Sequence, residues 1–228
     1  MKGRAEKILD GLWMVGDGRL SHPKDACVYL VDGGHEMALI DAGAGENPDA
    51  ILRNIEAAAH DVSRLKWILV THCHIDHVGG IPYLGRKTGA KVMCHAKCAE
   101  ILAIGDDSRT AAKWYGMSLE PITSDVTFDG PSETVKFGNA ELTLLHTPGH
   151  SPDSISIYGT IADKKVLFGQ DIHGPFSPVL GSDIELWRQS MRKLIELRAE
   201  ILCEGHYGVI REQKQVEQFI RSFLEENA

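Results

Sequence analysis

Short apolar runs that alternate with glycine, aspartate and proline dominate the beginning of the chain. Such runs occur at residues 12–15, 27–31 and 37–40, and this pattern predicts β-strands joined by tight turns. A helix is predicted from Pro48 to His60, because apolar residues recur there at helical spacing and Asn47 stands before the proline as a cap. The chain therefore begins as a sheet and continues with a helix.

Several later apolar runs lead directly into polar side chains. The run at 67–70 has no polar alternation, which suits a strand buried on both faces. Because ligand-binding groups gather at the carboxyl ends of strands in α/β folds, these strand ends predict one shared site. The runs and the polar residues that follow them are 67–70 with the cluster 72–77, 141–145 with His150, 165–168 with Asp171, and 201–203 with His206.

The segment from about 105 to 125 does not continue the alternation of predicted strands and helices. It concentrates aromatic residues in a chain in which they amount to 7%, and we interpret this lid segment (residues 105–125) as an insertion over the site. No linker or short-period repeat divides the chain, so we predict a single α/β domain over residues 1–228. The remaining elements are predicted as strands at 91–94 and 155–158 and helices at 96–104, 183–198 and 212–226.

Composition and charge narrow the function classes. Hydrophobic residues make up 43% and charged residues 25% of the 228 residues, which is ordinary for a soluble globular protein. The formal net charge of −8 gives no electrostatic reason to expect a nucleic-acid partner. The N-terminus has no apolar stretch of the length of a signal peptide or membrane span, and the odd number of cysteines fits a reducing compartment. We therefore expect a cytoplasmic protein with no membrane association.

Four potential metal ligands stand within six residues of one another, namely His72, His74, Asp76 and His77. Imidazole and carboxylate groups are the expected ligands of borderline divalent metals. In an extended segment residues 72 and 74 point the same way, while 76 and 77 can turn toward a second position. Without a cation these crowded groups would repel and desolvate one another. The cluster therefore predicts two adjacent metal ions.

The chain resembles the metallo-β-lactamase superfamily over nearly its entire length. The His-X-His-X-Asp-His motif is matched in full at 72–77, followed in order by Thr147-Pro-Gly-His150, by Asp171 at a strand end and by the late His206. The resemblance implies a four-layer αββα sandwich with the site at one edge of its two sheets. It also implies a ligand set, in which the first metal takes His72, His74 and His150, the second takes Asp76, His77 and His206, and Asp171 bridges them.

Two neighbouring cations can share a hydroxide, lower its pKa and polarise the substrate oxygen, so that the hydroxide is the nucleophile. By resemblance, Asp76 is the catalytic residue that orients the hydroxide and passes its proton to the leaving group. Zinc is the first expectation for both divalent ions, with iron or manganese admissible. Cys73 occupies a variable position of the motif and is predicted to be structural. For Cys94 and Cys98, buried thiols and a metal pair both stay open.

Substrate contacts are predicted from position alone. His173 follows Asp171 by two residues, Tyr207 stands beside His206, and Trp114 and Phe176 fall in the segments that overhang the metals. Apolar walls with a few polar groups are what a small-molecule pocket offers. For His173 a simple loop histidine is the alternative, and for the aromatic residues it is a lid packed on itself.

The expected function is a dinuclear metal-dependent hydrolase that cleaves an ester, thioester or lactone of a small molecule. The alternative is a mononuclear non-haem iron oxygenase resembling persulfide dioxygenases, which would use His72, His150 and Asp171. Asp171 disfavours a β-lactamase, and the acidic charge disfavours a nucleic-acid phosphodiesterase. Only 22 residues follow His206, which disfavours a glutathione thioesterase of ordinary length. The oligomeric state, including a homo-oligomer, stays open.

Overall fold

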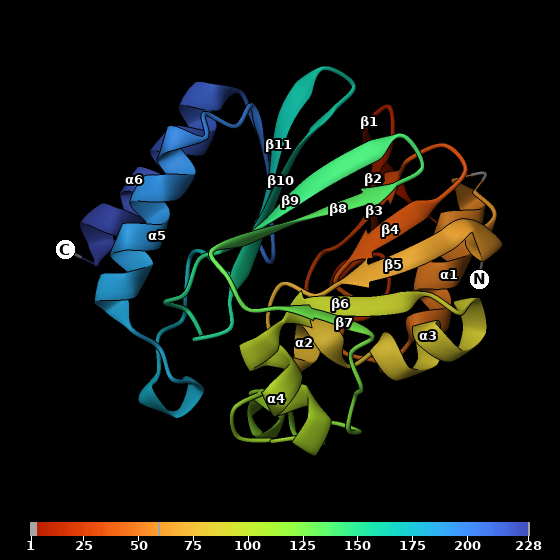
Figure 1. Cartoon of the computed structure of the whole chain (residues 1–228), viewed down its shortest axis with the longest axis horizontal. Coiled ribbons are helices and arrows are strands. Elements are labelled where there is room, and N and C mark those ends of the chain that lie inside the picture. Colours follow the sequence, from red (N-terminus) through yellow and green to blue (C-terminus); the bar gives the residue numbers. More distant parts are fainter. Residues whose placement is uncertain (1–3, 59, 228) are drawn as a thin grey trace.

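Two stacked β-sheets form the centre of the molecule (Figure 1). The computed structural model describes residues 4–58 and 60–227. The first sheet is antiparallel from β1 to β4 and parallel from β4 to β7, with the strands in sequence order. Its strands are β1 (Glu6–Leu9), β2 (Leu12–Gly16), β3 (Val28–Asp32), β4 (Met37–Ile40), β5 (Leu65–Leu69), β6 (Lys91–His95) and β7 (Val126–Phe128).

The second sheet has the order β13-β12-β11-β10-β9-β8. All its neighbouring strands are antiparallel except β11 and β12, which are parallel. The strands are β8 (Ser132–Phe137), β9 (Ala140–His146), β10 (Ile155–Ile161), β11 (Lys164–Gln170), β12 (Ile201–Glu204) and β13 (Gly208–Arg211).

Helices lie along the outer faces of both sheets (Figure 1). The first sheet has α1 (Pro48–Ala57), α3 (Ile81–Thr88) and α4 (Ala96–Ile104) beside it, and the second has α5 (Ile184–Glu196) and α6 (Gln213–Glu226). A single-turn helix, α2 (Ile75–Val78), lies inside the histidine cluster. Short 3₁₀ turns are η1 (Val62–Arg64), η2 (Ala112–Tyr115) and η3 (Pro178–Leu180).

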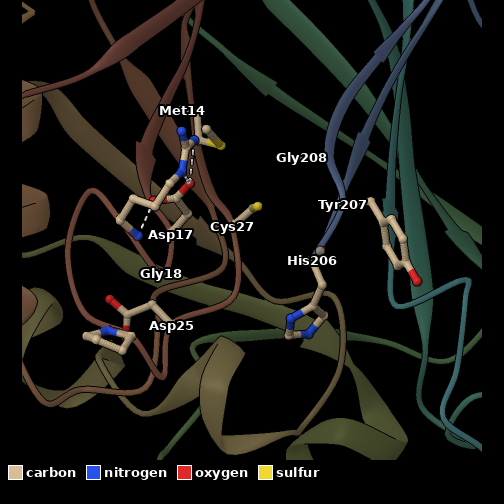
Figure 2. Close-up of a pocket in the computed structure, with 11 residues that line it drawn as sticks. Met14, Asp17, Gly18, Asp25, Cys27, His206, Tyr207 and Gly208 are labelled. Carbon is tan, nitrogen blue, oxygen red and sulfur yellow. Dashed lines mark hydrogen bonds and ion pairs between the residues drawn. The ribbon is translucent and has the colours of Figure 1, made fainter.

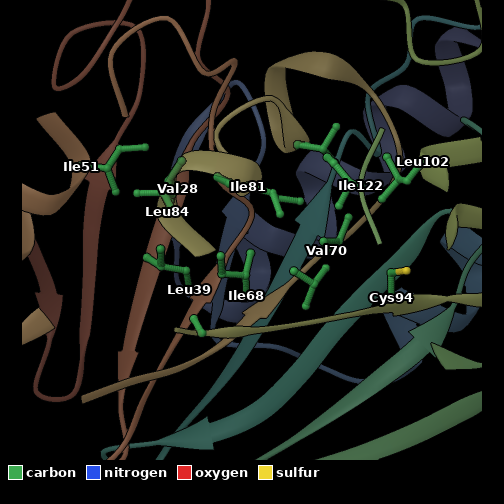
Figure 3. Close-up of a cluster of buried hydrophobic side chains, with 14 of the residues drawn as sticks. Val28, Leu39, Ile51, Ile68, Val70, Ile81, Leu84, Cys94, Leu102 and Ile122 are labelled. Atoms are coloured by element: carbon green, nitrogen blue, oxygen red, sulfur yellow. The ribbon is translucent and has the colours of Figure 1, made fainter. Parts of the chain in front are cut away.

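Three apolar cores separate the layers. One lies under α1, α3 and α4 and includes Leu39, Ile68 and Leu84 (Figure 3). A second lies between the two sheets, and a third lies between the second sheet and the helices α5 and α6. The order helix, sheet, sheet, helix confirms the predicted αββα sandwich.

Strand β3 shows why the apolar runs of the first sheet lack polar alternation. Val28 and Leu30 belong to the core under the helices, whereas Tyr29 and Val31 belong to the core between the sheets. Successive side chains of a strand point to opposite faces, so a strand with a core on each face needs apolar residues at every position.

The predicted first helix is correct at its start and too long at its end. Helix α1 begins at Pro48 and ends at Ala57 rather than at His60; residue 59, within the predicted range, lies outside the described residues. The Asn47 side chain makes no capping bond, and its amide N–H donates to the Ser21 carbonyl oxygen at 3.1 Å. Strands β1, β7, β8 and β13 were not predicted, and β8 is mostly polar and exposed, so its sequence carries little strand signal.

No helix within residues 4–58 and 60–227 combines the length and the apolar character that crossing a membrane would require.

Candidate metal centre

The predicted metal ligands meet at one edge of the two sheets. His72 and His74 follow β5, and α2 carries Asp76 and His77. The remaining ligands follow strands of the second sheet, with His150 after β9, Asp171 after β11 and His206 after β12. The structure arranges them as a first ligand group (His72, His74, His150 and Asp171) and a second ligand group (Asp76, His77, His206 and Asp171), each with its ligand atoms within 4.8 Å of one another.

The first ligand group is compact and buried. Nδ1 of His74 lies 3.0 Å from Nε2 of His72 and 2.9 Å from Nε2 of His150. Oδ2 of Asp171 lies 3.8 Å from Nε2 of His72 and 3.7 Å from Nε2 of His150. All four residues are at most 4% exposed. Three ring nitrogens and one carboxylate oxygen therefore converge on one buried point.

The second ligand group is looser and reaches the surface. Nε2 of His206 lies 3.3 Å from Oδ2 of Asp76 and 3.2 Å from Oδ2 of Asp171. Nε2 of His77 lies 3.1 Å from Oδ1 of Asp171 and 3.8 Å from Oδ2 of Asp76. The His206 side chain is 34% exposed, in contrast to its buried partners. Asp171 belongs to both groups, as the predicted bridging ligand should.

Asp41 and Thr71 orient one histidine of each group. Oδ2 of Asp41 accepts hydrogen bonds from Nδ1 of His77 and from the Thr71 hydroxyl, both at 2.7 Å. The Thr71 hydroxyl donates its proton to Asp41, so its oxygen can only accept from His72. Nδ1–H of His72 therefore donates to this oxygen, which lies 3.1 Å away. The Nε2 atoms of His72 and His77 are thereby left facing the ligand groups. Such outer partners fix the ring and the tautomer of a metal-binding histidine.

The lone pairs of the first group fit a cation. Nδ1–H of His150 donates to the Pro175 carbonyl oxygen at 2.9 Å, so its Nε2 also carries a lone pair. Nε2 of His72 and Nε2 of His150 both face Nδ1 of His74, which holds at most one proton. At least one buried lone pair thus lacks a proton donor in this trio, and a divalent ion coordinated by imidazole would satisfy it.

Unpartnered buried atoms make the same case for the second group. Nε2 of His77 and Oδ1 of Asp171 have no hydrogen-bond partner among the described residues. Buried polar atoms without partners destabilise a fold unless something else, such as a metal, binds them. Gly205 permits this crowding, because a Cβ there would lie 2.2 Å from Oδ1 of Asp171. The donor atoms of the second group therefore also fit a divalent ion.

The histidines of the first group favour the neutral, metal-binding form. Burial lowers the pKa of His72 well below its ordinary value, and the nearby His77 and His74 lower it further. Burial likewise lowers the pKa of His74 to about 4 and that of His150 to about 3. Their ring nitrogens hold no extra proton that a metal would have to displace near neutral pH.

The histidines of the second group have the opposite shift. Burial alone would lower the pKa of His77, but Asp171, Asp41 and Asp76 outweigh it and raise the pKa well above the ordinary value. The pKa of His206 rises to about 10, because hydrogen bonds to Asp171 and Asp76 outweigh the effect of burial. In the metal-free protein these two imidazoles therefore carry the positive charge that the neighbouring carboxylates require.

A pocket of about 140 Å³ opens over both ligand groups. Ala111, Trp114 and Tyr115 of the lid segment form one wall, and Pro175 and Leu180 belong to another. The lid segment is held on the metal loop by backbone pairing, since the Ile75 N–H donates to the Thr110 carbonyl oxygen at 2.8 Å. The residues predicted as an insertion over the site therefore line it.

Tyr115 makes direct contact with a predicted metal ligand. Its hydroxyl donates a hydrogen bond to Oδ2 of Asp76 at 2.8 Å. Burial and the negative charge of Asp76 raise the pKa of the phenol well above its ordinary value, so it stays a neutral donor. The sequence places Tyr115 in the lid segment, but nothing in its pattern indicates this bond across 39 residues.

His173 lines the pocket and is fixed by Glu204. Nδ1 of His173 lies 2.7 Å from Oε1 of Glu204, whose side chain is fully buried. Oε2 of Glu204 accepts the backbone N–H groups of His206 and Tyr207 at 2.7 and 2.9 Å. Glu204 thus holds together a pocket residue and the turn that carries a metal ligand.

Two of the four predicted substrate contacts lie outside the pocket. Trp114 and His173 line it, whereas Phe176 packs its ring on Trp187, with centroids 5.0 Å apart. Tyr207 packs instead near Phe219, with centroids 5.4 Å apart, and borders a neighbouring cavity. Phe176 thus packs against an aromatic ring of helix α5, whereas Tyr207 stays 58% exposed.

The cysteines lie away from the ligand atoms. The Cys73 thiol lies 3.6 Å from Oδ1 of Asp153 and 3.7 Å from the Arg109 carbonyl oxygen, and the residue belongs to the core under the helices. Cys94 and Cys98 are buried in the same core. Among the described residues, the sets of three or more ligands close enough to hold a metal include neither of them.

Asp41, Thr71 and Glu204 are the supporting residues that the sequence analysis missed. Their positions in the sequence could have indicated this role, because Asp41 follows the last residue of β4 and Thr71 comes shortly after β5. Glu204 is the last residue of β12, two residues before His206. A polar residue at the end of an apolar strand that leads to the site would have identified all three.

A family model described as the Metallo-beta-lactamase superfamily matches residues 25–206 of the chain. The match spans most of the chain and includes every residue of both ligand groups.

Two curated relatives match most of this chain with a smaller part of their own length. It is 29% identical to an atrochrysone carboxyl ACP thioesterase of Aspergillus fumigatus, over 82% of this chain and 52% of the relative. It is 36% identical to a hydroxyacylglutathione hydrolase of Anaeromyxobacter dehalogenans, over 60% of this chain and 43% of the relative. The chain thus spans about half the length of these two relatives.

Solved structures share the fold. A metallo-beta-lactamase of Cronobacter sakazakii superposes with a TM-score of 0.83, covering 99% of this chain and 93% of that chain at 22% sequence identity. Likeness at this identity concerns the architecture and not the substrate.

Proposed function

The chain belongs to the metallo-beta-lactamase superfamily and is accordingly a metal-dependent hydrolase; from that premise we propose that it is dinuclear and cleaves an ester, thioester or lactone bond of a small molecule. The observation that carries this proposal is the pair of ligand groups joined by Asp171. One group alone would suit a mononuclear enzyme. Two groups that share a carboxylate suit a pair of ions, for which zinc is the first candidate by ligand type.

When bound, two divalent ions would lower the pKa of a shared water and polarise the oxygen of the scissile carbonyl. His72, His74 and His150 would hold one ion, Asp76, His77 and His206 the other, and Asp171 both. Three of these ligands are positioned by hydrogen bonds that they donate, His77 to Asp41, His72 to the Thr71 hydroxyl oxygen and His150 to the Pro175 carbonyl oxygen. The ligands are thus held in place before substrate arrives, which is the condition for precise metal catalysis.

Asp76 is the proton carrier in this proposal. Its carboxylate lines the pocket and accepts a hydrogen bond from the Tyr115 hydroxyl at 2.8 Å. In this position it can take the proton of the attacking water and deliver it to the leaving group. Tyr115 holds the carboxylate in orientation, and Ala111 and Trp114 of the lid segment line the same pocket.

Thioesters are the first substrates to test. One matched relative is named a thioesterase and another a hydroxyacylglutathione hydrolase. The pocket over the ligand groups, of about 140 Å³, has room for a small acyl group. Among the three acyl bonds that the site could cleave, these names favour the thioester.

The test is elemental analysis of protein purified without added metal, followed by a panel of thioesters, lactones, esters, phosphodiesters and β-lactams. We expect two divalent ions per chain and hydrolysis of an acyl bond. One iron per chain, with consumption of oxygen in the presence of a persulfide, would instead identify the mononuclear oxygenase. Hydrolysis restricted to phosphodiesters or β-lactams would also contradict the proposal.

A further inference from the structure

The pocket over the metal ligands has a polar floor and apolar walls. His74, His150 and Asp171 lie on the floor, where the scissile carbonyl must bind to be hydrolysed. Ala111 and Leu180 come from different segments and contribute apolar wall surface. A substrate group that fills the space between these walls must itself be apolar.

Burial of the wall residues distinguishes the closed end of the pocket from its mouth. Leu180 is 1% and Ala111 is 3% exposed, so they lie at the closed end. Trp114 is 54% exposed and stands at the mouth. The volume of about 140 Å³ holds roughly five groups of the size of a water molecule, each of which takes about 30 Å³. A short hydrocarbon chain fits, and a long one does not.

A larger cavity of about 430 Å³ lies on the other side of His206. It is bordered by Asp17, Arg19 and Asp25 as well as by His206 itself, and its lining is mixed in charge and largely polar. In Figure 2 His206 and Tyr207 leave their turn in opposite directions, with the His206 ring on the side of Asp25 and Cys27. The space around the second ligand group is therefore small with apolar walls on one side and large and polar on the other.

We propose that the small pocket binds the acyl part of the substrate and admits chains of up to roughly five carbon atoms, and that the leaving group extends past His206 toward the larger cavity. Leu180 sets the chain length, because it closes the apolar end. This inference rests on the proposed hydrolase function and specifies its substrate class as short-chain acyl thioesters with a larger, polar thiol part.

The reaction is an ordinary hydrolysis in which atoms balance. Water adds its oxygen to the carbonyl carbon, the carbon–sulfur bond breaks, and the sulfur leaves with the electron pair of that bond. One proton of the water goes to the sulfur, so the products are a carboxylic acid and a thiol. No oxidant or further reactant is needed.

The experiment compares kcat/KM for acetyl, butanoyl, hexanoyl, octanoyl and dodecanoyl thioesters, each on glutathione and on N-acetylcysteamine, with the metal-loaded protein. For the wild type we expect a fall of about tenfold or more between butanoyl and hexanoyl, since hexanoyl has one carbon more than the roughly five that fit and one surplus methylene in a filled pocket costs about 10- to 200-fold. The position of this fall should be the same for both thiols.

Leu180→Ala should move the fall toward octanoyl or longer chains, and should raise the octanoyl-to-butanoyl ratio of kcat/KM about tenfold. Trp114→Ala is the second variant, because its exposed side chain contributes little to folding; it should also raise this ratio. The matched control is Val179→Ala, which changes the neighbouring residue of the same turn, a residue that is 57% exposed and does not line the pocket.

An unchanged chain-length profile in folded Leu180→Ala and in Trp114→Ala would overturn this inference while leaving the hydrolase intact. So would a wild-type profile that is flat from acetyl to dodecanoyl, or a shift in tolerance for the thiol rather than for the acyl chain. If the metal-loaded wild type hydrolyses no acyl bond at all, the proposed function itself fails, and this inference fails with it.

Discussion

The two ligand groups share Asp171 and yet differ in almost every physical respect. The first consists of residues at most 4% exposed, with pKa values of about 4 for His74 and about 3 for His150. The second contains His206, whose side chain is 34% exposed and whose pKa is about 10. Carboxylates explain the contrast, since Asp76 and Asp171 surround the histidines of the second group.

This difference predicts an order of metal binding. An ion that enters the first group displaces no extra proton from His74 or His150 near neutral pH, whereas an ion that enters the second must displace the protons of His77 and His206. The first group is therefore expected to bind more tightly and to stay occupied. The second group, open through His206 to the pocket, is expected to exchange its ion and to set the activity.

The largest loss of activity is expected from a substitution of the ligand that the two groups share. Asp171→Ala removes the one ligand that both groups share. Because metal ions supply several kcal/mol of transition-state stabilisation and each 1.4 kcal/mol is about a factor of ten, kcat/KM should fall about a thousand-fold or more. Metal content should fall with it. A variant that keeps two ions and full turnover would contradict the bridging role.

Single substitutions in each group should separate them. His150→Ala should lose the ion of the first group and nearly all activity. His206→Ala should keep about one ion per chain and lose roughly a hundredfold in kcat/KM, because the second ion is lost. The measurements are elemental analysis and thioester turnover on the same preparations. If both variants lose the same amount of metal, the two ligand groups do not bind their ions with the different affinities proposed here.

Lowering the pH should weaken the second group selectively. Below pH 10 His206 carries a proton in the metal-free protein, so the affinity of its group should fall about tenfold per displaced proton for each pH unit. The first group should change little above about pH 5, since His74 titrates near 4 and His150 near 3. Titrations with a competing chelator at pH 6, 7 and 8 measure both steps. If the affinities of the two groups fall equally as the pH is lowered, the histidines of the two groups do not differ in protonation as proposed.

The smallest of these effects concerns the lid segment. Tyr115→Phe removes the hydrogen bond to Oδ2 of Asp76 and leaves the ring. We expect kcat to fall about tenfold with little change in KM and no loss of the first ion, which is the lower end of the effect of an outer hydrogen-bond partner. Lys113→Ala is the control, because this exposed residue of the same 3₁₀ turn does not line the pocket, and it should leave kcat nearly unchanged. If Tyr115→Phe behaves like that control, Tyr115 does not position Asp76.

The pattern of apolar runs located most of the strands and the positions of the ligand candidates for one physical reason, while the order of the layers was implied by the resemblance to the superfamily. Apolar runs without alternation identify strands with a core on each side, and the ligand candidates follow such strands directly, as His72 follows β5 and Asp171 follows β11. Local pattern and site position therefore coincide. The same reasoning applies to the end of β12, which is buried throughout, whereas β9 alternates and has fully buried residues on one face only.

What the sequence could not provide depends on contacts between distant segments. The bond from Tyr115 to Asp76 spans 39 residues, and the pair of His173 and Glu204 spans 31. The direction of a loop side chain is likewise set by its neighbours, so Phe176 was expected at the pocket and packs on Trp187 instead. Opposite pKa shifts in two adjacent histidine groups also arise only when carboxylates from three separate segments come together.

The most direct test is a calorimetric titration of the metal-free protein with zinc, in which protons released and thioester turnover are recorded at each addition. We predict two ions per chain in two steps, with a tight first step that releases few protons near neutral pH. The second, weaker step should release protons and should bring activity. Binding of a single ion per chain, or full activity after the first step, would contradict a dinuclear hydrolase built from two unequal ligand groups.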